Sequence, residues 1–421
     1  MRGPSLRVAV VATALCATLA GCGKSLPHAA VEPGSGSTGT LSAHGAASAS
    51  TVNTTRLGGS NPTIDAAAIA VAEYPGLTPA TRPRAVVLVS SDDWPAALAA
   101  SVLAGAPLHA PLLYSEGSTL PEASSRALRA MEPTGTGSSG GSALRGLPDG
   151  VQAIEVGQTA KPSGYHALAV AANRPAVGSA AMAVSIERLV SVLRGHRPRR
   201  VIVTADDGPP AMTMPAAGLS AETGAPILYV DRSGIPRATR IELARLGRGI
   251  SMYVVGSSSV VGERVRSELE RFGAVTRIAG STPASNAIAV ARFTDGSFGW
   301  GVLEPGHGLV FANAARPLDG PAAAPLSASG DYGPLLLLES SSRLGSALGG
   351  YLSDLQPGSP PSGPVHGVYN HGWLIGDESA ISATTQARLD TILGISSRPS
   401  QEPEVASPTT SSSELTPPNE P

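Results

Sequence analysis

The chain has 421 residues, with 30 basic and 32 acidic side chains and a formal net charge of −2. This near neutrality argues against bulk nucleic-acid binding, which depends on neutralising many phosphates. Aromatic residues make up only 4 % of the chain, which also argues against surfaces on which bases or sugars stack.

The first 22 residues predict an export signal that ends at a lipid-attachment site. Two arginines precede the apolar run Val8–Leu19, which is shorter than the about 20 residues that span a bilayer. The next residues complete Leu19-Ala20-Gly21-Cys22, which resembles the bacterial lipobox. The resemblance implies cleavage before Cys22 and acylation of its thiol, and an ordinary signal peptide with a chance cysteine is the alternative. We therefore expect an exported protein, lipid-anchored to the outer face of the cytoplasmic membrane within the cell envelope.

Residues 23–54 are rich in Gly, Ser, Thr and Ala and predict a flexible tether. A repeated sequence element follows. Arg56–Pro62 (RLGGSNP) corresponds to Arg277–Pro283 (RIAGSTP), and a small-residue, Ala-rich stretch follows each copy. A weaker copy begins at Pro175, so the three prolines are 113 and 108 residues apart. This spacing predicts three tandem repeats, at residues 55–165, 166–276 and 277–395.

Each repeat contains short apolar strands alternating with helices. In chain order, the strands are expected at residues 84–89, 111–114, 151–156, 200–205, 226–229, 252–256, 274–278, 309–312, 334–338 and 373–376, with helices between them. Continuous apolar runs are typical of buried parallel strands, so we predict an α/β fold with one parallel sheet in each repeat. The third repeat is degenerate, because Asn313–Arg316 replaces an acidic pair. The Pro/Ser/Glu tail, residues 396–421, should be disordered.

The ordered set of motifs resembles the cell-wall-binding repeat type 2. These motifs are R-[IL]-x-G-S-x-P, V-V-L-V-S-S-D-D, P-[IL]-L, L-P and V-V-G, and they span about residues 55–395. The resemblance implies a flavodoxin-like or toprim-like fold in each repeat, three repeats in a pseudo-threefold arrangement, and a non-catalytic module that binds an anionic wall polymer. The usual second arginine of the family motif is missing here, and the double glycine is single at Gly157, Gly256 and Gly376.

Three groups of residues are candidate ligand contacts. Arg56 and Arg277 could bind phosphate or carboxylate groups, or each could pair with a neighbouring acid and hold its turn. Asp92–Asp93 and Asp206–Asp207 follow strands, at the sheet edge where α/β proteins bind ligands. They could hold a bridging cation, or they could be helix N-caps. The basic run Arg194–Arg200 is either a solvated loop or a contact with an anionic surface.

The sequence predicts no catalytic residues, no cofactor and no metal site, and hence no enzyme. The partners we expect are an anionic cell-wall polymer and, through lipidated Cys22, the membrane, with a monomer as one possible state. Two other functions remain open. One is a solute-binding lipoprotein of a transporter, although that class is built as two lobes rather than three repeats. The other is an envelope hydrolase or its accessory protein.

Overall fold

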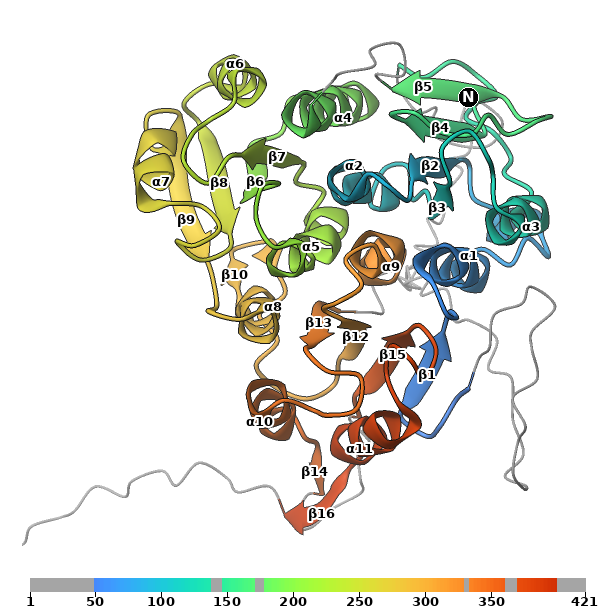
Figure 1. Ribbon diagram of the computed structural model, residues 1–421, viewed down its shortest axis with the longest axis vertical. Coiled ribbons are helices and arrows are strands. Elements are labelled where there is room, and N and C mark those ends of the chain that lie inside the picture. Colours follow the sequence, from blue (N-terminus) through green and yellow to red (C-terminus); the bar gives the residue numbers. More distant parts are fainter. Residues whose placement is uncertain (1–48, 138–145, 171–177, 329–332, 360–368, 400–421) are drawn as a thin grey trace, which may run out of the picture. The chain divides into compact units, whose positions relative to one another are not determined.

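The computed structural model describes residues 49–137, 146–170, 178–328, 333–359 and 369–399. These residues form three parallel sheets of four strands each, with helices packed against them (Figure 1). The predicted α/β fold of tandem parallel-sheet units is therefore confirmed. Within these described ranges, no helix is long and apolar enough to cross a membrane.

The first sheet has the strand order β3-β2-β4-β5, and all neighbouring strands are parallel. Strands β2, β3 and β4 are almost entirely buried, as their continuous Val, Leu and Ile runs predict. The elements of this part are β2 (Val86–Ser90), α2 (Trp94–Ala100), β3 (Leu112–Ser115), α3 (Glu122–Met131), β4 (Ala153–Val156) and β5 (Ala167–Val170).

The second sheet repeats this topology with the order β7-β6-β8-β9. Its last strand, β9, pairs with β8 along the full length of both strands. The elements of this part are α4 (Ser179–Arg194), β6 (Arg200–Ala205), α5 (Pro215–Thr223), β7 (Ile227–Val230), α6 (Arg237–Leu246), β8 (Ile250–Val255), α7 (Glu263–Leu269) and β9 (Gly273–Ile278).

The third sheet joins the two ends of the described chain. Its order is β1-β15-β12-β13, so the N-terminal strand β1 pairs in parallel with β15 near the C-terminus (blue beside red in Figure 1). The elements of this part are β1 (Thr54–Leu57), α1 (Pro62–Glu73), α8 (Pro283–Arg292), β12 (Gly308–Asn313), α9 (Asp319–Ser327), β13 (Leu335–Leu338), α10 (Ser346–Asp354), β15 (His371–Ile375) and α11 (Ala383–Leu393). Each sheet thus takes its fourth strand from the start of a repeated element.

Three equivalent helices, α2, α5 and α9, contact one another in the centre (Figure 1). Their sequences are rich in Ala, and α5 and α9 each contain a Gly, so small side chains permit close approach of their backbones. Each of them also packs against the helix that leaves its own sheet: α4 against α2, α8 against α5, and α1 against α9. The same contacts therefore recur three times in a ring, which is the pseudo-threefold arrangement expected from the repeats.

Two buried tyrosines fasten this ring by equivalent hydrogen bonds. The Tyr229 hydroxyl of β7 donates to the Pro95 carbonyl in the first turn of α2, at 2.7 Å. The Tyr114 hydroxyl of β3 donates to the Leu318 carbonyl just before α9, at 2.6 Å. In β13 the same register position is occupied by Leu337, which has no hydroxyl. The third repeat therefore lacks the tyrosine hydrogen bond to a central helix that the first and second repeats make.

The insertion after α8 contains the short hairpin of β10 (Thr294–Asp295) and β11 (Phe298–Gly299). It packs on the second sheet, because Phe298 stacks on Tyr253 of β8 with ring centroids 3.7 Å apart. The Tyr253 hydroxyl also donates to Asp295, at 2.8 Å. This insertion gives the aromatic-poor chain one compact aromatic cluster.

The expectation of disorder from residue 396 needs one revision. Residues Ser396–Pro399 form strand β16, which pairs in parallel with β14 (Gly358–Ser359). The backbone hydrogen bond from Ser396 to Pro357, at 2.7 Å, begins this pairing. Residues 400–421, the rest of the predicted tail, lie outside the described residues, as do the signal segment, Cys22 and most of the tether.

Candidate functional site

Arg56 occupies the penultimate position of β1, and its side chain points into the protein, where only 3 % of the residue is exposed. Its guanidinium donates to the Gly376 carbonyl at 2.9 Å and to the Ile381 carbonyl at 2.7 Å. It also donates to the Gln386 amide oxygen on α11 through Nε and Nη2. Burial lowers the pKa of Arg56, and the nearby Glu378 and Asp377 oppose that shift. We call this set of contacts the Arg56 joint.

Arg277 makes the equivalent contacts from β9. Its guanidinium donates to the Gly256 carbonyl at 2.7 Å and to the Val261 carbonyl at 2.8 Å. It also pairs with Glu263 at 3.1 Å, and its side chain is 17 % exposed. We call this set the Arg277 joint. Both joints tie a strand end to the turn after the neighbouring strand, so the geometry favours the turn-holding role over direct contact with a ligand.

The strand registers place a third residue at the same position. Arg56 lies opposite Leu374, Arg277 opposite Val254, and Ala169 opposite Glu155. In the first sheet the alanine cannot donate to the carbonyls that follow β4. The joint is therefore present in two of the three sheets.

Asp92 and Asp93 follow β2, and they differ in role. Asp93 is the N-cap of α2, since its carboxylate accepts a hydrogen bond from the Ala96 amide at 3.0 Å. This is the stabilising contact that helix N-termini favour. Asp92 is exposed, and its side chain makes no hydrogen bond within the described ranges. The helix-cap interpretation of this pair is therefore correct for Asp93 but not for Asp92.

Asp206 and Asp207 fix the surroundings of β6. Asp206 accepts a hydrogen bond from the hydroxyl of Ser179 at the start of α4. The Arg232 amide donates to both carboxylate oxygens of Asp207, at 3.0 and 3.1 Å. Burial, together with the carboxylates of Asp231 and Asp207, raises the pKa of Asp206. The strand registers make Asp207, not Asp206, the equivalent of Asp92. The two acidic pairs are therefore offset by one residue, which explains why they make different contacts.

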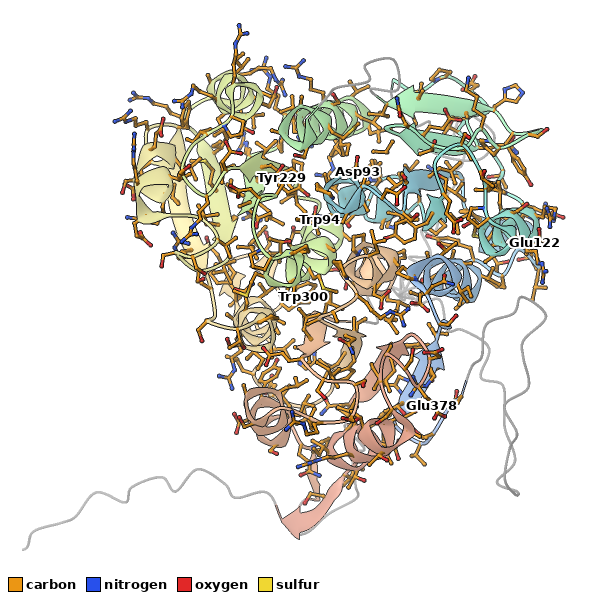
Figure 2. The ribbon with its side chains drawn as sticks, in the orientation of Figure 1. Asp93, Trp94, Glu122, Tyr229, Trp300 and Glu378 are labelled. Atoms are coloured by element: carbon orange, nitrogen blue, oxygen red, sulfur yellow. The ribbon has the colours of Figure 1, made fainter. Side chains whose placement is uncertain are left out.

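The ring of helices brings part of the predicted set together. Asp93 and Asp206 both lie near Tyr229. Burial raises the pKa of Tyr229, and these two carboxylates raise it further. Figure 2 shows Asp93 and Trp94 beside Tyr229 where the first two sheets meet. Arg56 and Arg277 hold turns in two different sheets, so the six candidates do not converge on one site.

A buried cluster that the sequence reasoning missed lies beside the Arg56 joint. Asp65 on α1 accepts from the Gly59 amide at 2.6 Å and forms an ion pair with Arg316. Arg316 also pairs with Asp319 at 2.9 Å, and both carboxylates are fully buried. Burial raises the pKa of Asp65 to about 6 and that of Asp319 well above its usual value. The cluster therefore holds two carboxylates against one guanidinium, where α1 packs on α9.

A signal for this cluster was available in the repeated element. Asp65 and Asn286 lie at matching offsets in the two copies, and Asn286 accepts from the Gly280 amide at 3.0 Å in the same way. An acid at that place in an Ala-rich helix needs a cationic partner when buried, but Arg316 lies 251 residues away. Within the described ranges, no group of three or more His, Cys, Asp and Glu side chains could hold a metal ion.

Comparison with known proteins shows similarity in structure only. No family model and no curated protein matches the chain. Solved structures do match, among them two proteins from Clostridium difficile. Cwp6 from Clostridium difficile has a TM-score of 0.63 and 15 % identity, over 83 % of this chain and 48 % of that one. Cwp8 from Clostridium difficile has a TM-score of 0.58 and 16 % identity, over 82 % of this chain and 52 % of that one. The chain spans about half the length of each, and at such identity the likeness shows the fold.

Proposed function

We propose that this protein is a non-catalytic module that binds an anionic polymer of the cell wall or envelope and is held at the membrane through lipidated Cys22. The observation that carries the proposal is the fold of three parallel sheets in a ring, shared with two cell-wall proteins over more than four-fifths of the chain. The lipobox-like segment Leu19–Cys22 supports a location in the cell envelope. Neither feature depends on Arg56 or Arg277 as ligand contacts.

The two rival functions fit the structure less well. A solute-binding lipoprotein has two lobes around a cleft, whereas this chain divides its strands among three equivalent sheets. An envelope hydrolase needs a nucleophile and base, or a metal, beside a substrate groove. Three of the four predicted acidic residues, Asp93, Asp206 and Asp207, instead cap a helix or accept hydrogen bonds from neighbouring segments.

Polymer binding is tested by co-sedimentation of residues 23–421 with purified cell-wall polymer at low and at high salt. We expect retention at low salt and release at high salt, because counterions compete for the charged groups. Absence of retention at low salt would contradict the proposal. Release of soluble peptidoglycan fragments by the same protein would favour the hydrolase instead.

Lipid anchoring is tested separately with the full chain expressed in a bacterial host. The wild-type protein should fractionate with the membrane and incorporate labelled fatty acid, and Cys22→Ser should do neither. A Cys16→Ser variant is the matched control, since Cys16 lies within the predicted signal. Equal fractionation of the wild type and Cys22→Ser would contradict anchoring through Cys22. It would not affect the proposal of polymer binding, which the co-sedimentation experiment tests.

A further inference from the structure

An open groove of about 680 Å³ is lined by residues of α4, the loop after it and α6. Helices α4 and α6 contact each other near β7 (Figure 1). The walls of the groove include Arg188 and Val192 of α4, His196 and Arg197 of the loop after α4, and Arg245 of α6. Part of the basic run Arg194–Arg200, which the function proposed above does not use, therefore lines a groove and does not simply face solvent.

Two buried glutamates hold the arginines of the groove in place. Glu242 of α6 accepts from Arg188 at 3.0 Å and also pairs with Arg245. Glu187 of α4 accepts two bonds from Arg245, at 3.0 and 2.9 Å. Both glutamates are fully buried, whereas the side chains of Arg188 and Arg245 are 55 % and 28 % exposed. The carboxylates thus lie beneath the groove and the guanidinium groups at its surface.

Some donors of the guanidinium groups have no acceptor among the residues that the structure describes. Arg245 uses Nε and Nη2 on the two glutamates, and Arg197 uses Nη1 on the Arg245 carbonyl at 2.7 Å. Within the described ranges, Nη1 of Arg245 and Nη2 of Arg197 have no acceptor. Guanidinium groups fixed in this way suit phosphate and carboxylate oxygens, which accept bonds from two donors at once.

The charge of the groove is positive in spite of the two glutamates. Burial, together with the hydrogen bond to Glu242, raises the pKa of Glu187 to about 7. Burial opposes ionisation of Glu242 as well, but the bonds from Glu187, Arg245 and Arg188 lower its pKa. Near neutral pH, fewer than two negative charges therefore face three arginines.

The charge of the whole chain is unevenly distributed in the same sense. Residues 166–276 contain 14 arginines and 9 acidic residues, a net charge of +5. Residues 55–165 contain 7 basic and 9 acidic residues, and residues 277–395 contain 5 and 9. The near neutrality of the chain thus conceals one basic repeat between two acidic ones, and anions should be attracted to the second repeat.

We propose that the groove between α4 and α6 binds a phosphate or carboxylate group of the envelope polymer through Arg188, Arg197 and Arg245. This inference rests on the proposed polymer binding and assigns it to the second repeat. Val192, 47 % exposed in the groove wall, offers an apolar surface for the chain that carries the anion. Because the groove is open, it can admit a segment of a long polymer.

The decisive experiment compares two charge reversals in residues 23–421. Arg197→Glu changes the groove, and Arg388→Glu on α11 makes the same change of net charge at an exposed arginine of the third repeat. Affinity is measured for purified cell-wall polymer, for poly(glycerol phosphate) and for polygalacturonate, which separate phosphate from carboxylate. We expect Arg197→Glu to weaken binding at least tenfold and Arg388→Glu less than twofold. An equal loss in both variants, or no loss in Arg197→Glu, overturns the groove as the site.

A second pair of variants tests the groove wall with two ion-paired arginines of similar exposure. Arg188 pairs with Glu242 and Arg292 pairs with Asp354, and their side chains are 55 % and 45 % exposed. Arg188→Gln should weaken binding and Arg292→Gln should not, with thermal melting curves showing that both variants fold. Equal binding by the two variants contradicts the assignment.

Three outcomes of these experiments identify what fails. If the wild type binds vesicles of phosphatidylglycerol but none of the three polymers, a lipid headgroup replaces the polymer as ligand and the assignment is overturned. If the wild type binds polymer and Arg197→Glu binds equally well, only the groove is wrong and the proposed function stands. If the wild type binds no polymer at any salt, both proposals fail.

Discussion

The Arg56 joint and the Arg277 joint have the same sequence element, the same strand register and equivalent pairs of carbonyl acceptors. They differ in the length of chain that lies between the arginine and its acceptors. Arg277 bonds to residues 16 and 21 positions away, whereas Arg56 bonds to residues 320 and 325 positions away. Arg56 is also almost fully buried, and Arg277 is partly exposed beside Glu263. The same local device thus holds a turn in one place and closes the ring of sheets in the other.

The largest effect should follow from removing the guanidinium that closes the ring. Arg56→Met leaves the Gly376 and Ile381 carbonyls and the Gln386 amide without their buried donor. We expect the free energy of unfolding to fall by about 3 kcal/mol, since bonds to charged groups contribute about 1.5–3 kcal/mol and unsatisfied buried groups cost more. Urea denaturation measures this loss, and hydrogen exchange should show β1 and α11 opening first. A loss below about 1 kcal/mol would show that strand pairing alone closes the ring.

Arg277→Met, the matched variant, should have a smaller effect. Its partners lie within one sheet, and Glu263 is 60 % exposed, so water can replace part of what is lost. We expect about 1 kcal/mol of destabilisation in the same urea experiment. If the two variants lose equal stability, chain separation and burial do not distinguish the joints.

The two joints differ further in the side chain that accepts from the glycine amide, Asp65 in one and Asn286 in the other. Asp65 shares Arg316 with Asp319, and burial raises the pKa of both carboxyls. The folded state therefore holds protons that the unfolded state releases, and stability is lost as the pH rises through about 6 and above. Asp319→Asn keeps that position neutral, so its stability relative to the wild type should rise by about 1–3 kcal/mol from pH 5 to pH 8.

Urea denaturation of wild type and Asp319→Asn at several pH values measures this difference, and it cancels the contributions of other titrating groups. Asp354→Asn is the control, because Asp354 is 67 % exposed in its pair with Arg292. A difference that stays constant from pH 5 to pH 8 would mean that Asp319 keeps an ordinary pKa.

The same contrast explains how much the sequence could predict. The strands and most helices follow from apolar runs and capping residues, which are local, and Asp93 is a cap of the expected kind. The partner of β1 is not local, because nothing in Thr54–Leu57 specifies β15 rather than a strand of its own repeat. Arg56 and Asp65 were visible in the repeated element, but the acceptors of Arg56 and the arginine that pairs with Asp65 lie more than 250 residues away. Local patterns therefore predicted the elements, and long-range packing decided what the polar side chains do.

The smallest expected effect comes from supplying the joint that the first sheet lacks. Ala169 occupies the equivalent position in β5, is exposed, and lies opposite Glu155. The Gly157 amide donates to the Val170 carbonyl at 3.2 Å, as the Gly256 amide does to Ile278 at 3.0 Å, so the turn that an arginine would contact has the same start. Ala169→Arg should stabilise the protein by about 0.5–1 kcal/mol, measured by urea denaturation. Ala169→Lys is the control, because it adds the same charge without the planar fork that reaches two carbonyls. An equal gain from lysine would attribute the effect to Glu155, whereas a gain specific to arginine would show that the joint itself is transferable between sheets.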